Sequence, residues 1–413
     1  MIIMNSSLKI HPISFINAMS NALELSAVGI SKHHHRTAII ARYIGSKLNM
    51  SQGELQILIY SSLLHDIGAA ANWDEKHFIA HAENDERIFK HAEEGYNILR
   101  ESPQLGMLAE PIRHHHDRFN GKNPTGIKGH DIPLMSRIIH IADRIEVQID
   151  KEIHIFQQRS RIISNIENCD FYDPDLVSVF KELSETEYFW LDIVNPEYEK
   201  NFLNDLRFFG KLLFDIDDLI IIAEMFSKII DATSHYTASH SQSVAKVAKF
   251  LSKQRGFSEN ETKEFYLAGL LHDLGKLAIP NEILNKPGSL TKDEFDIIKQ
   301  HPYYSHRILE QIEGFEKIAS WVGAHHETLD GRGYPYKLKS EKIELGSRII
   351  SVADVFTALI EERPYRVGLT IKETFSIIDE MVHNMKLDPN IVKDIKEDSK
   401  LVIQLINSPQ GIL

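Results

Sequence analysis

Apolar residues recur with the period of an amphipathic helix along most of the chain. Val244, Val247, Ala248 and Leu251 follow the i, i+3, i+4, i+7 spacing, and Gly256 stands where that helix should end. Runs that alternate apolar and polar residues, as a half-buried strand would, are scarce. The pattern therefore predicts an all-α protein, with loops around 276–290, 328–345 and 361–370.

Capping boxes mark the starts of three further helices. In each box a Ser or Thr is followed three residues later by a Glu, so that side chain and backbone satisfy each other's hydrogen bonds. The boxes lie at 51–54, 258–261 and 291–294. The helix that follows Ser258 should run to His272, and the helix that follows Thr291 should end near His301-Pro302.

The chain repeats itself. His33 precedes His65 by 32 residues, and His240 precedes His272 by the same 32. The offset between the copies starts at 207 residues and drifts to 215, as small loop insertions would cause. The period is far too long for a solenoid. We predict two tandem helical-bundle domains, residues 1–210 and 211–413, joined near 205–220.

Histidine is unusually frequent. The chain has 22 His against 21 Gly, and its one cysteine is Cys169. Histidine is the commonest metal ligand and titrates near neutral pH. A single cysteine excludes a disulfide framework and Cys-rich zinc modules, which leaves sites built from His and carboxylates. Proportions of 43% hydrophobic and 25% charged residues are those of a globular protein.

The net charge limits the kinds of molecule that the protein is expected to bind. A formal net charge of −13 disfavours a broad surface for DNA or RNA, whose binding depends on Lys and Arg. A small anionic substrate remains compatible with this net charge if cations gather in one cleft.

The most apolar stretch, 219–230, is interrupted by Glu224 and Lys228, so no membrane span is expected. The lone cysteine and the lack of a signal-peptide pattern predict the cytoplasm.

The second copy carries a candidate metal site. The pair His272-Asp273 ends an apolar helix, where buried polar side chains need partners. One divalent ion could be surrounded by two His and two Asp, a second ion by three His, and Asp273 could bridge them. Mixed imidazole and carboxylate ligands suit Fe, Mn, Zn or Ni. The first set is His240, His272, Asp273 and Asp354, and the second is His301, His325 and His326.

Two ions about 3.5–4 Å apart generate hydroxide near neutral pH and clamp a phosphoryl group. Lys276, one turn beyond His272-Asp273, is placed to hold the phosphate. Arg363 and Arg366 offer planar forks for a second phosphate or a guanine edge, and Tyr334 could stack on a base. The alternatives remain open: a surface lysine, arginines that brace a loop, and a turn aromatic.

Residues 230–400 resemble the HD-GYP family of HD metal-dependent phosphohydrolases. The motifs are His240-Ser241, His272-Asp273-Leu-Gly-Lys276, Ile279-Pro280, Leu284-Asn-Lys-Pro287-Gly288, His301-Pro302, His325-His326-Glu327, Asp330-Gly331-Arg-Gly333-Tyr334-Pro335, Ala353-Asp354 and Arg363-Pro364-Tyr365-Arg366.

That resemblance implies a bacterial phosphodiesterase with a helical-bundle fold and two or three metal ions, commonly iron or manganese. Members hydrolyse cyclic di-GMP to the linear dinucleotide pGpG and often on to GMP, and some related members prefer cyclic GMP–AMP. The resemblance implies metal roles for the seven His and Asp residues named above. It implies substrate contacts for Lys276, Tyr334, Arg363 and Arg366.

Two departures from the family pattern matter. Members with three metals have a carboxylate one turn before the first histidine, where this chain has Tyr236. We therefore expect two metal ions, although Asp231 or His235 could compensate. Thr357 replaces an aspartate that is frequent in the family, at a position with no expected metal role.

The first copy has a His or Asp at every position that corresponds to a predicted metal ligand of the second copy. It lacks residues that correspond to the predicted phosphate-binding lysine and arginines. Ala69 stands where Lys276 does, 122–124 read Lys-Asn-Pro in place of Gly-Tyr-Pro, and nothing near 151–161 matches the arginine motif. The copy could be a metal-loaded regulatory domain, an active site of different specificity, or a structural partner. Its ligand positions are His33, His65, Asp66, His91, His115, His116 and Asp143.

The leading hypothesis is a phosphodiesterase that hydrolyses cyclic di-GMP, with specificity for 3'3'-cyclic GMP–AMP as an alternative. Asp273 would bridge the metals and orient the nucleophile, while Lys276 and the arginines stabilise the developing charge. Two alternative hypotheses remain: a catalytically poor module that senses a nucleotide, and an HD phosphohydrolase that acts on other nucleotides. The duplicated domains could also pack against each other or pair two chains.

Overall fold

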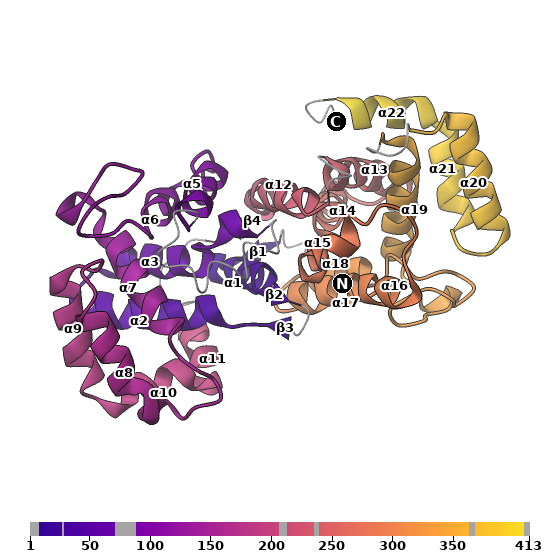
Figure 1. Ribbon diagram of the computed structural model, residues 1–413. Helices are drawn as coiled ribbons and strands as arrows, with labels where there is room; N and C mark the ends of the chain where they lie inside the picture. The colour runs from indigo at the N-terminus through magenta and orange to yellow at the C-terminus, as the bar shows by residue number, and fades with distance from the viewer. Residues whose placement is uncertain are drawn as a thin grey trace, which may run out of the picture. The chain divides into compact units, whose positions relative to one another are not determined.

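The computed structural model describes residues 8–26, 29–70, 88–205, 213–234, 239–362 and 368–408. These residues form helices almost throughout, which confirms the predicted all-α class (Figure 1). Within them, strands are limited to the two-residue β1 (Lys9–Ile10), β2 (Leu25–Ser26), β3 (Gly29–Ile30) and β4 (Phe214–Asp215). Among the described helices, none combines the length and hydropathy that a bilayer crossing demands.

The chain folds into two compact units. The C-terminal unit comprises Met1–Ile10, Leu25–Val28 and Leu213–Leu413, and the N-terminal unit comprises His11–Glu24 and Gly29–Leu212. The division lies within the stretch where we expected the two copies to join. The sequence pattern did not predict that two short early segments join the second copy. For the first of them, β1 pairs antiparallel with β4, Ile10 opposite Phe214.

In the C-terminal unit, α13 lies against α14, α19 and α22, and α14 also packs on α12 and α18. The core between them is apolar, and Phe265 stacks on Trp321 with ring centroids 4.3 Å apart. The helices are α12 (Ile216–Ala232), α13 (His240–Gln254), α14 (Glu259–Leu271), η5 (Leu274–Ala278), α15 (Asn281–Leu284), α16 (Lys292–Ile298), α17 (His301–Leu309), α18 (Glu316–Gly323), η6 (Ser340–Lys342), α19 (Leu345–Ile360), α20 (Ile371–His383), α21 (Pro389–Glu397) and α22 (Ser399–Asn407).

The N-terminal unit repeats this packing, since α2 lies against α3 and α7 as α13 lies against α14 and α19. Trp190 and Phe180 are fully buried in its core. Its helices are α1 (Pro12–Leu23), α2 (His33–Lys47), α3 (Gln52–Leu64), η1 (Ile67–Ala69), α5 (Ile88–Leu99), η2 (Gly106–Leu108), α6 (Ala109–Arg113), η3 (Gly129–Asp131), α7 (Leu134–Glu146), α8 (Ile155–Glu167), α9 (Pro174–Ser184), α10 (Glu187–Val194) and α11 (Pro196–Asp205).

The three predicted capping boxes are present. Ser51, Ser258 and Thr291 each accept from the backbone N–H of the Glu three residues on, and each Glu reaches back. A good N-cap stabilises a helix by about 1 kcal/mol. Gly256, with φ +80°, follows the end of α13 as predicted, because a left-handed backbone suits glycine.

Two sequence predictions were wrong in detail. The helix after Thr291 ends at Ile298, and α17 starts afresh at His301. Pro302 explains the break, because proline fits the first turn of a helix but lacks the N–H that an interior position donates. The predicted loop 276–290 contains the end of η5 and the short helix α15. Of the predicted loop 361–370, residues 363–367 lie outside the described part.

Candidate functional site

The predicted histidines of the second copy sit at helix ends. His240 and His301 open α13 and α17, while His272 and His325 directly follow the ends of α14 and α18. Three of them donate Nδ1–H to a carbonyl three residues earlier, at 2.6–2.8 Å. That hydrogen bond fixes the ring and leaves Nε2 with its lone pair facing inward. The residues held in this way are His272, His301 and His325.

The structure brings the two predicted ligand sets together around Asp273. Its Oδ2 lies 3.1 Å from His272 Nε2, and its Oδ1 lies 3.3 Å from His301 Nε2. His240 Nε2 lies 3.1 Å from Asp354 Oδ1. The ligand atoms of His301, His325 and His326 lie within 4.8 Å of one another, as do those of His240, His272 and Asp273. Asp273 therefore turns one oxygen toward each set.

Unpaired buried nitrogens show that these residues fit a metal. Nε2 of His272, His301 and His325 is buried and makes no hydrogen bond. An unpaired buried polar atom costs free energy, on the order of several kcal/mol in an apolar site. Imidazole nitrogens and carboxylate oxygens are suitable donors for Fe, Mn, Zn or Ni, and a divalent ion would satisfy all three.

The charge states suit coordination. Burial lowers the pKa of His301 to about 3 and of His325 to about 4, so both rings are neutral at pH 7. Burial opposes ionisation of Asp273, but His272 and Lys276 outweigh it and hold the pKa of this carboxyl well below its usual range. A metal requires neutral imidazoles and ionised carboxylates, which His301, His325 and Asp273 already supply. Burial disfavours the charged form of His272, but Asp273 outweighs it and raises the pKa of this ring.

His240, like His272, differs from His301 and His325 in having a raised pKa. Burial disfavours its charged form, but hydrogen bonds with Asp354 and Glu361 prevail and raise its pKa to about 10. Its Nδ1 faces Glu361 Oε2 at 3.0 Å. A carboxylate behind a ligand histidine orients the ring and strengthens it as a donor. His240 would release a proton on binding a metal, and Glu361 would remain as its support.

A cavity of about 940 Å³ opens onto this cluster. Lys276, Tyr334, Asp273 and Asp354 line it, together with Lys286. Lys276 Nζ lies 2.5 Å from Asp273 Oδ2, and the ring centroid of Tyr334 is 4.9 Å from that of His326. The volume is at the upper end of the usual range for small-molecule sites. Predicted metal ligands and predicted substrate contacts thus share one cavity.

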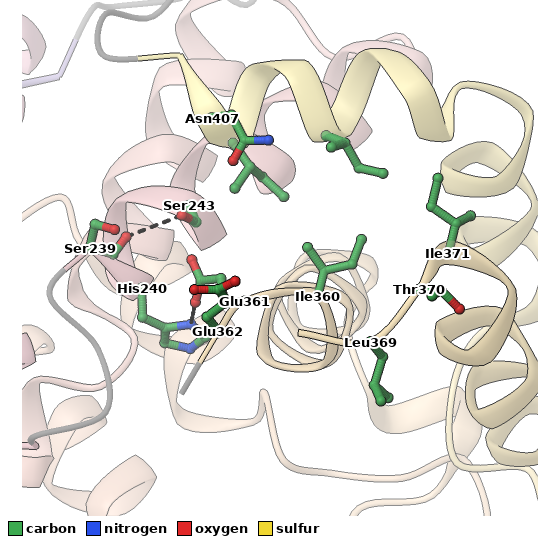
Figure 2. A pocket seen from close by; sticks show the side chains of 12 residues that line it. Ser239, His240, Ser243, Ile360, Glu361, Glu362, Leu369, Thr370, Ile371 and Asn407 are labelled. Atoms are coloured by element: carbon green, nitrogen blue, oxygen red, sulfur yellow. Dashed lines mark hydrogen bonds and ion pairs between the residues drawn. The ribbon is translucent and has the colours of Figure 1, made fainter. Parts of the chain in front are cut away.

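A second cavity of about 710 Å³ lies against His240 and is lined by Ser239, Glu361, Glu362 and Ile371 among others (Figure 2). The figure shows Glu361 reaching the His240 ring, and both side chains line this cavity. Arg363 and Arg366, which directly follow these glutamates, lie outside the described residues, as do His235 and Tyr236.

Asp231 anchors a helix start. Its Oδ1 accepts from Ser241 Oγ at 2.7 Å, and its Oδ2 accepts from the Ser241 N–H at 3.1 Å. Ser241 is the second residue of α13, so Asp231 fixes the backbone that carries His240. Burial raises the pKa of Asp231. These contacts give Asp231 a role in positioning His240 that the sequence alone did not indicate.

Sequence reasoning missed three supporting residues of the second copy. Glu361 supports His240, and Lys286 lines the cavity with its Nζ 2.7 Å from Glu294. Glu327 accepts from the backbone N–H of 336, 337 and 338 at 2.6–2.9 Å and so holds the loop that carries Tyr334. Glu327 and Lys286 had a signal, because each lies within a motif of the family pattern, whereas Glu361 had none.

Gly275 is expected to be essential for this geometry. A Cβ at Gly275 would lie 2.1 Å from the backbone O of His301, and one at Gly68 would meet His91 O at 2.0 Å. Gly275→Ala should therefore push η5 away from α17, lower the free energy of unfolding by about 1–3 kcal/mol, and weaken metal retention. Thermal unfolding and metal analysis would measure both effects.

Gly53→Ala is the matched control, because a Cβ there meets nothing within 4 Å. It lies in α3, where alanine is the better helix former, so stability should hold or rise slightly. Unchanged unfolding and metal content in Gly275→Ala would contradict the proposed close packing.

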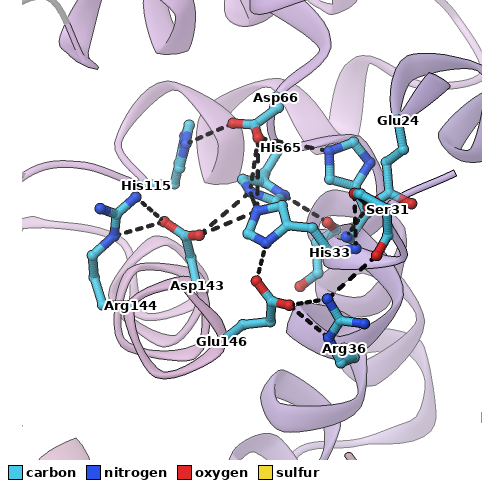
Figure 3. A network of polar contacts seen from close by, with 12 residues as sticks. Glu24, Ser31, His33, Arg36, His65, Asp66, His115, Asp143, Arg144 and Glu146 are labelled. Atoms are coloured by element: carbon cyan, nitrogen blue, oxygen red, sulfur yellow. Dashed lines mark hydrogen bonds and ion pairs between the residues drawn. The ribbon is translucent and has the colours of Figure 1, made fainter. Parts of the chain in front are cut away.

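The first copy also gathers its predicted ligands. His33 Nε2 lies 3.2 Å from His65 Nε2 and 3.3 Å from Asp143 Oδ1 (Figure 3). Asp66 Oδ1 lies 3.2 Å from His91 Nε2. The ligand atoms of Asp66, His91, His115 and His116 form one group within 4.8 Å. Ala69 is buried in η1, so no lysine faces these residues from that position.

Comparisons with known proteins agree with two such regions. The family model described as HD domain matches residues 17–168 and 224–391. A 3'3'-cGAMP-specific phosphodiesterase 1 from Vibrio cholerae is 31% identical over 398 residues, which cover 93% of this chain and 91% of that protein. A cyclic di-GMP phosphodiesterase from Thermotoga maritima is 36% identical over 166 residues, 40% of this chain and 44% of its own length.

One solved structure is similar over nearly the whole chain. The crystal structure of the cyclic GMP-AMP specific phosphodiesterase V-cGAP3 from V. cholerae aligns with a TM-score of 0.67 at 27% identity. The alignment covers 96% of this chain and 99% of that one. The similarity therefore extends over both units.

Proposed function

The chain belongs to the HD domain family, to members of the HD-GYP type, and we propose that it is a metal-dependent phosphodiesterase that opens a cyclic dinucleotide. The observation that carries the proposal is the cavity that brings Lys276 and Tyr334 to the ligand cluster. Cations and an aromatic ring beside a metal site suit a substrate that has phosphates and bases.

We propose 3'3'-cyclic GMP–AMP as the first substrate to test, with cyclic di-GMP as the second. The relatives named for cyclic GMP–AMP include two that align with 93% of this chain. Those named for cyclic di-GMP align with at most 40% of it. Similarity over both copies supports the mixed dinucleotide, while the second copy alone is compatible with either.

We further propose two ions, held by the seven residues predicted from the sequence, with Fe or Mn the first metals to test. Asp231 is engaged by Ser241, which favours two ions over three. When bound, such a pair supplies a nucleophile from water near neutral pH and positive charge for a phosphate oxygen. Asp273 would be shared between the ions, because its two oxygens face different ligand sets.

The chain's own residues would bind and orient the phosphodiester. Burial disfavours the Lys276 ammonium, but Asp273 outweighs it and raises the lysine pKa, so Lys276 presents a positive charge to the cavity. Negative charge grows on the phosphate oxygens during attack, and a fixed cation stabilises it. Burial also raises the pKa of Tyr334, which keeps the phenol protonated and able to donate a hydrogen bond or stack on a base.

Product chromatography tests the proposal. The full chain, loaded with Mn or Fe, is incubated separately with cyclic GMP–AMP, cyclic di-GMP and cyclic di-AMP. We expect a linear dinucleotide from the first or second, and none after chelation of the metal, with recovery when the metal is restored. Tight binding of a cyclic dinucleotide without any product from loaded protein would instead favour a sensing module.

A further inference from the structure

The first copy contains imidazole nitrogens that face each other. His65 Nδ1 donates to Ser62 O at 2.8 Å, and His33 Nδ1 faces Glu146. A neutral ring with its proton on Nδ1 has a lone pair on Nε2. The two Nε2 atoms nevertheless lie only 3.2 Å apart (Figure 3). The two nitrogens are close enough to share a proton when no metal is bound, and close enough to bind one divalent ion between them.

Carboxylates complete the surroundings of this cation. Asp143 Oδ1 lies 3.3 Å from His33 Nε2, and Asp66 Oδ2 lies 3.5 Å from His65 Nε2. Atoms bound to one ion at about 2.1 Å lie roughly 3.0–3.4 Å apart in octahedral or tetrahedral sites. The observed spacings are close to that range, so the side chains are already arranged as ligands.

Asp66 links this set to a second one. Its Oδ1 is buried without a hydrogen bond and lies 3.2 Å from His91 Nε2. His91 Nε2 in turn lies 3.3 Å from His115 Nε2 and 3.2 Å from His116 Nε2. Four potential ligand atoms thus converge on the far side of Asp66, as they do around Asp273 in the second copy.

His34 distinguishes the first copy from the second. Its Nε2 lies 3.6 Å from Asp66 Oδ2, and its ligand atom groups with those of His65 and Asp66. Ser20 Oγ contacts its Nδ1 at 3.1 Å, so the ring is held with Nε2 toward Asp66. The corresponding residue of the second copy is Ser241, which cannot reach a metal because it binds Asp231. The first copy therefore offers one more imidazole than the second.

Among the described residues of the first copy, two arginines bind the ligands or their supports. Arg144 is buried and donates to Asp143 Oδ2 from two nitrogens, at 2.6 and 2.9 Å. Arg36 donates to Glu146, which supports His33. Ala69 occupies the position of Lys276. Structural metal sites are filled by protein ligands, whereas catalytic ones keep an open position.

We propose that the N-terminal unit binds its own pair of divalent ions in a non-catalytic centre, in which His34 is an additional ligand. The centre is independent of the substrate and of the reaction proposed for the second copy. Its ions would hold α2, α3, α5 and α7 together, because these helices and the turns after them carry the ligands.

Metal analysis of the full chain tests this centre separately from catalysis. Protein loaded with Mn and then desalted should hold about four ions per chain if both copies bind a pair. Asp66→Asn should hold about two, as should Asp273→Asn, and the double variant should hold close to none. His130→Gln, an exposed histidine of the same unit, is the control and should match the unmodified chain. Circular dichroism would check that each variant is folded.

A substitution by the second copy's own residue tests the role of His34. His34→Ser keeps a side chain that Glu24 could bind as Asp231 binds Ser241, so folding should survive. We expect the first-copy ions to be lost to a chelator at least about 10-fold faster than from the unmodified chain. Unchanged chelation kinetics would remove His34 from the ligand set. Full metal content in Asp66→Asn, or complete metal loss in Asp273→Asn, would overturn the centre as a whole.

Discussion

Replacement of Asp273 by Asn is expected to lower hydrolysis of the cyclic dinucleotide by roughly 10³-fold or more, about 4 kcal/mol in the barrier. The carboxylate has one oxygen 3.1 Å from His272 Nε2 and the other 3.3 Å from His301 Nε2. Asparagine keeps the shape but offers one carbonyl oxygen and no charge, so both ligand sets lose their shared anion. Lys276 also loses its ion-pair partner.

Two measurements separate this loss from unfolding. Metal content should fall together with turnover, while the far-ultraviolet circular dichroism spectrum should be unchanged because the substitution is isosteric. Asp293→Asn, at an exposed position of α16, is the control and should retain turnover within about twofold, as surface substitutions usually do. If Asp273→Asn retained normal turnover with its metal in place, Asp273 would not be the shared ligand.

The helices and the ligand positions could be predicted because their signals are local. Capping boxes and apolar periodicity mark helix starts and faces, and the ligand histidines stand at fixed distances from them. His272 follows the helix that Ser258 caps, and His65 follows the one that Ser51 caps in the same way. Local patterns repeated in two copies therefore predicted seven candidate ligands in each, and the structure brings them together in clusters.

The supporting residues could not be predicted because their partners are distant in sequence. His240 is supported by Glu361, 121 positions away, whereas His33 is supported by Glu146, which lies within α7. The two copies thus take the same support from the ends of corresponding helices but at different positions, and no shared motif marks either glutamate. The joining of Lys9–Ile10 to the C-terminal unit is likewise a long-range pairing, through β1 and β4.

The two copies show how ligands and chemistry can separate after duplication. Ligand histidines are fixed by hydrogen bonds to the preceding helix turn, as in His65 and His272, so they persist wherever that turn persists. The proposed phosphate-binding residue, Lys276, is carried by the next turn and contacts the ligand set through Asp273. Under the proposals made above, a copy could lose catalysis and keep its metal, and Ala69 at the position of Lys276 is consistent with that outcome.

Lys276→Ala recreates that difference within the second copy. We expect kcat to fall by about 10²–10³-fold, the usual loss when one group that stabilises transition-state charge is removed. Metal content should remain that of the unmodified chain, because Lys276 is not among the ligand groups. Lys299→Ala, which removes an exposed lysine paired with Asp296 on α16, is the matched control and should change kcat by less than about twofold.

The separate changes in kcat and in KM of Lys276→Ala show how Lys276 contributes to the reaction. A lysine that only attracts the anionic substrate would raise KM and leave kcat intact, whereas one that stabilises charge during attack lowers kcat. Lys276→Arg keeps the positive charge but carries it on a broader head group. If the position of the charge matters as well as its presence, kcat should recover only in part in this variant. Loss of metal in Lys276→Ala would show instead that the lysine serves chiefly to hold Asp273, to which its ammonium is bound at 2.5 Å. The substrate-binding role would then pass to the remaining cation of the cavity, Lys286.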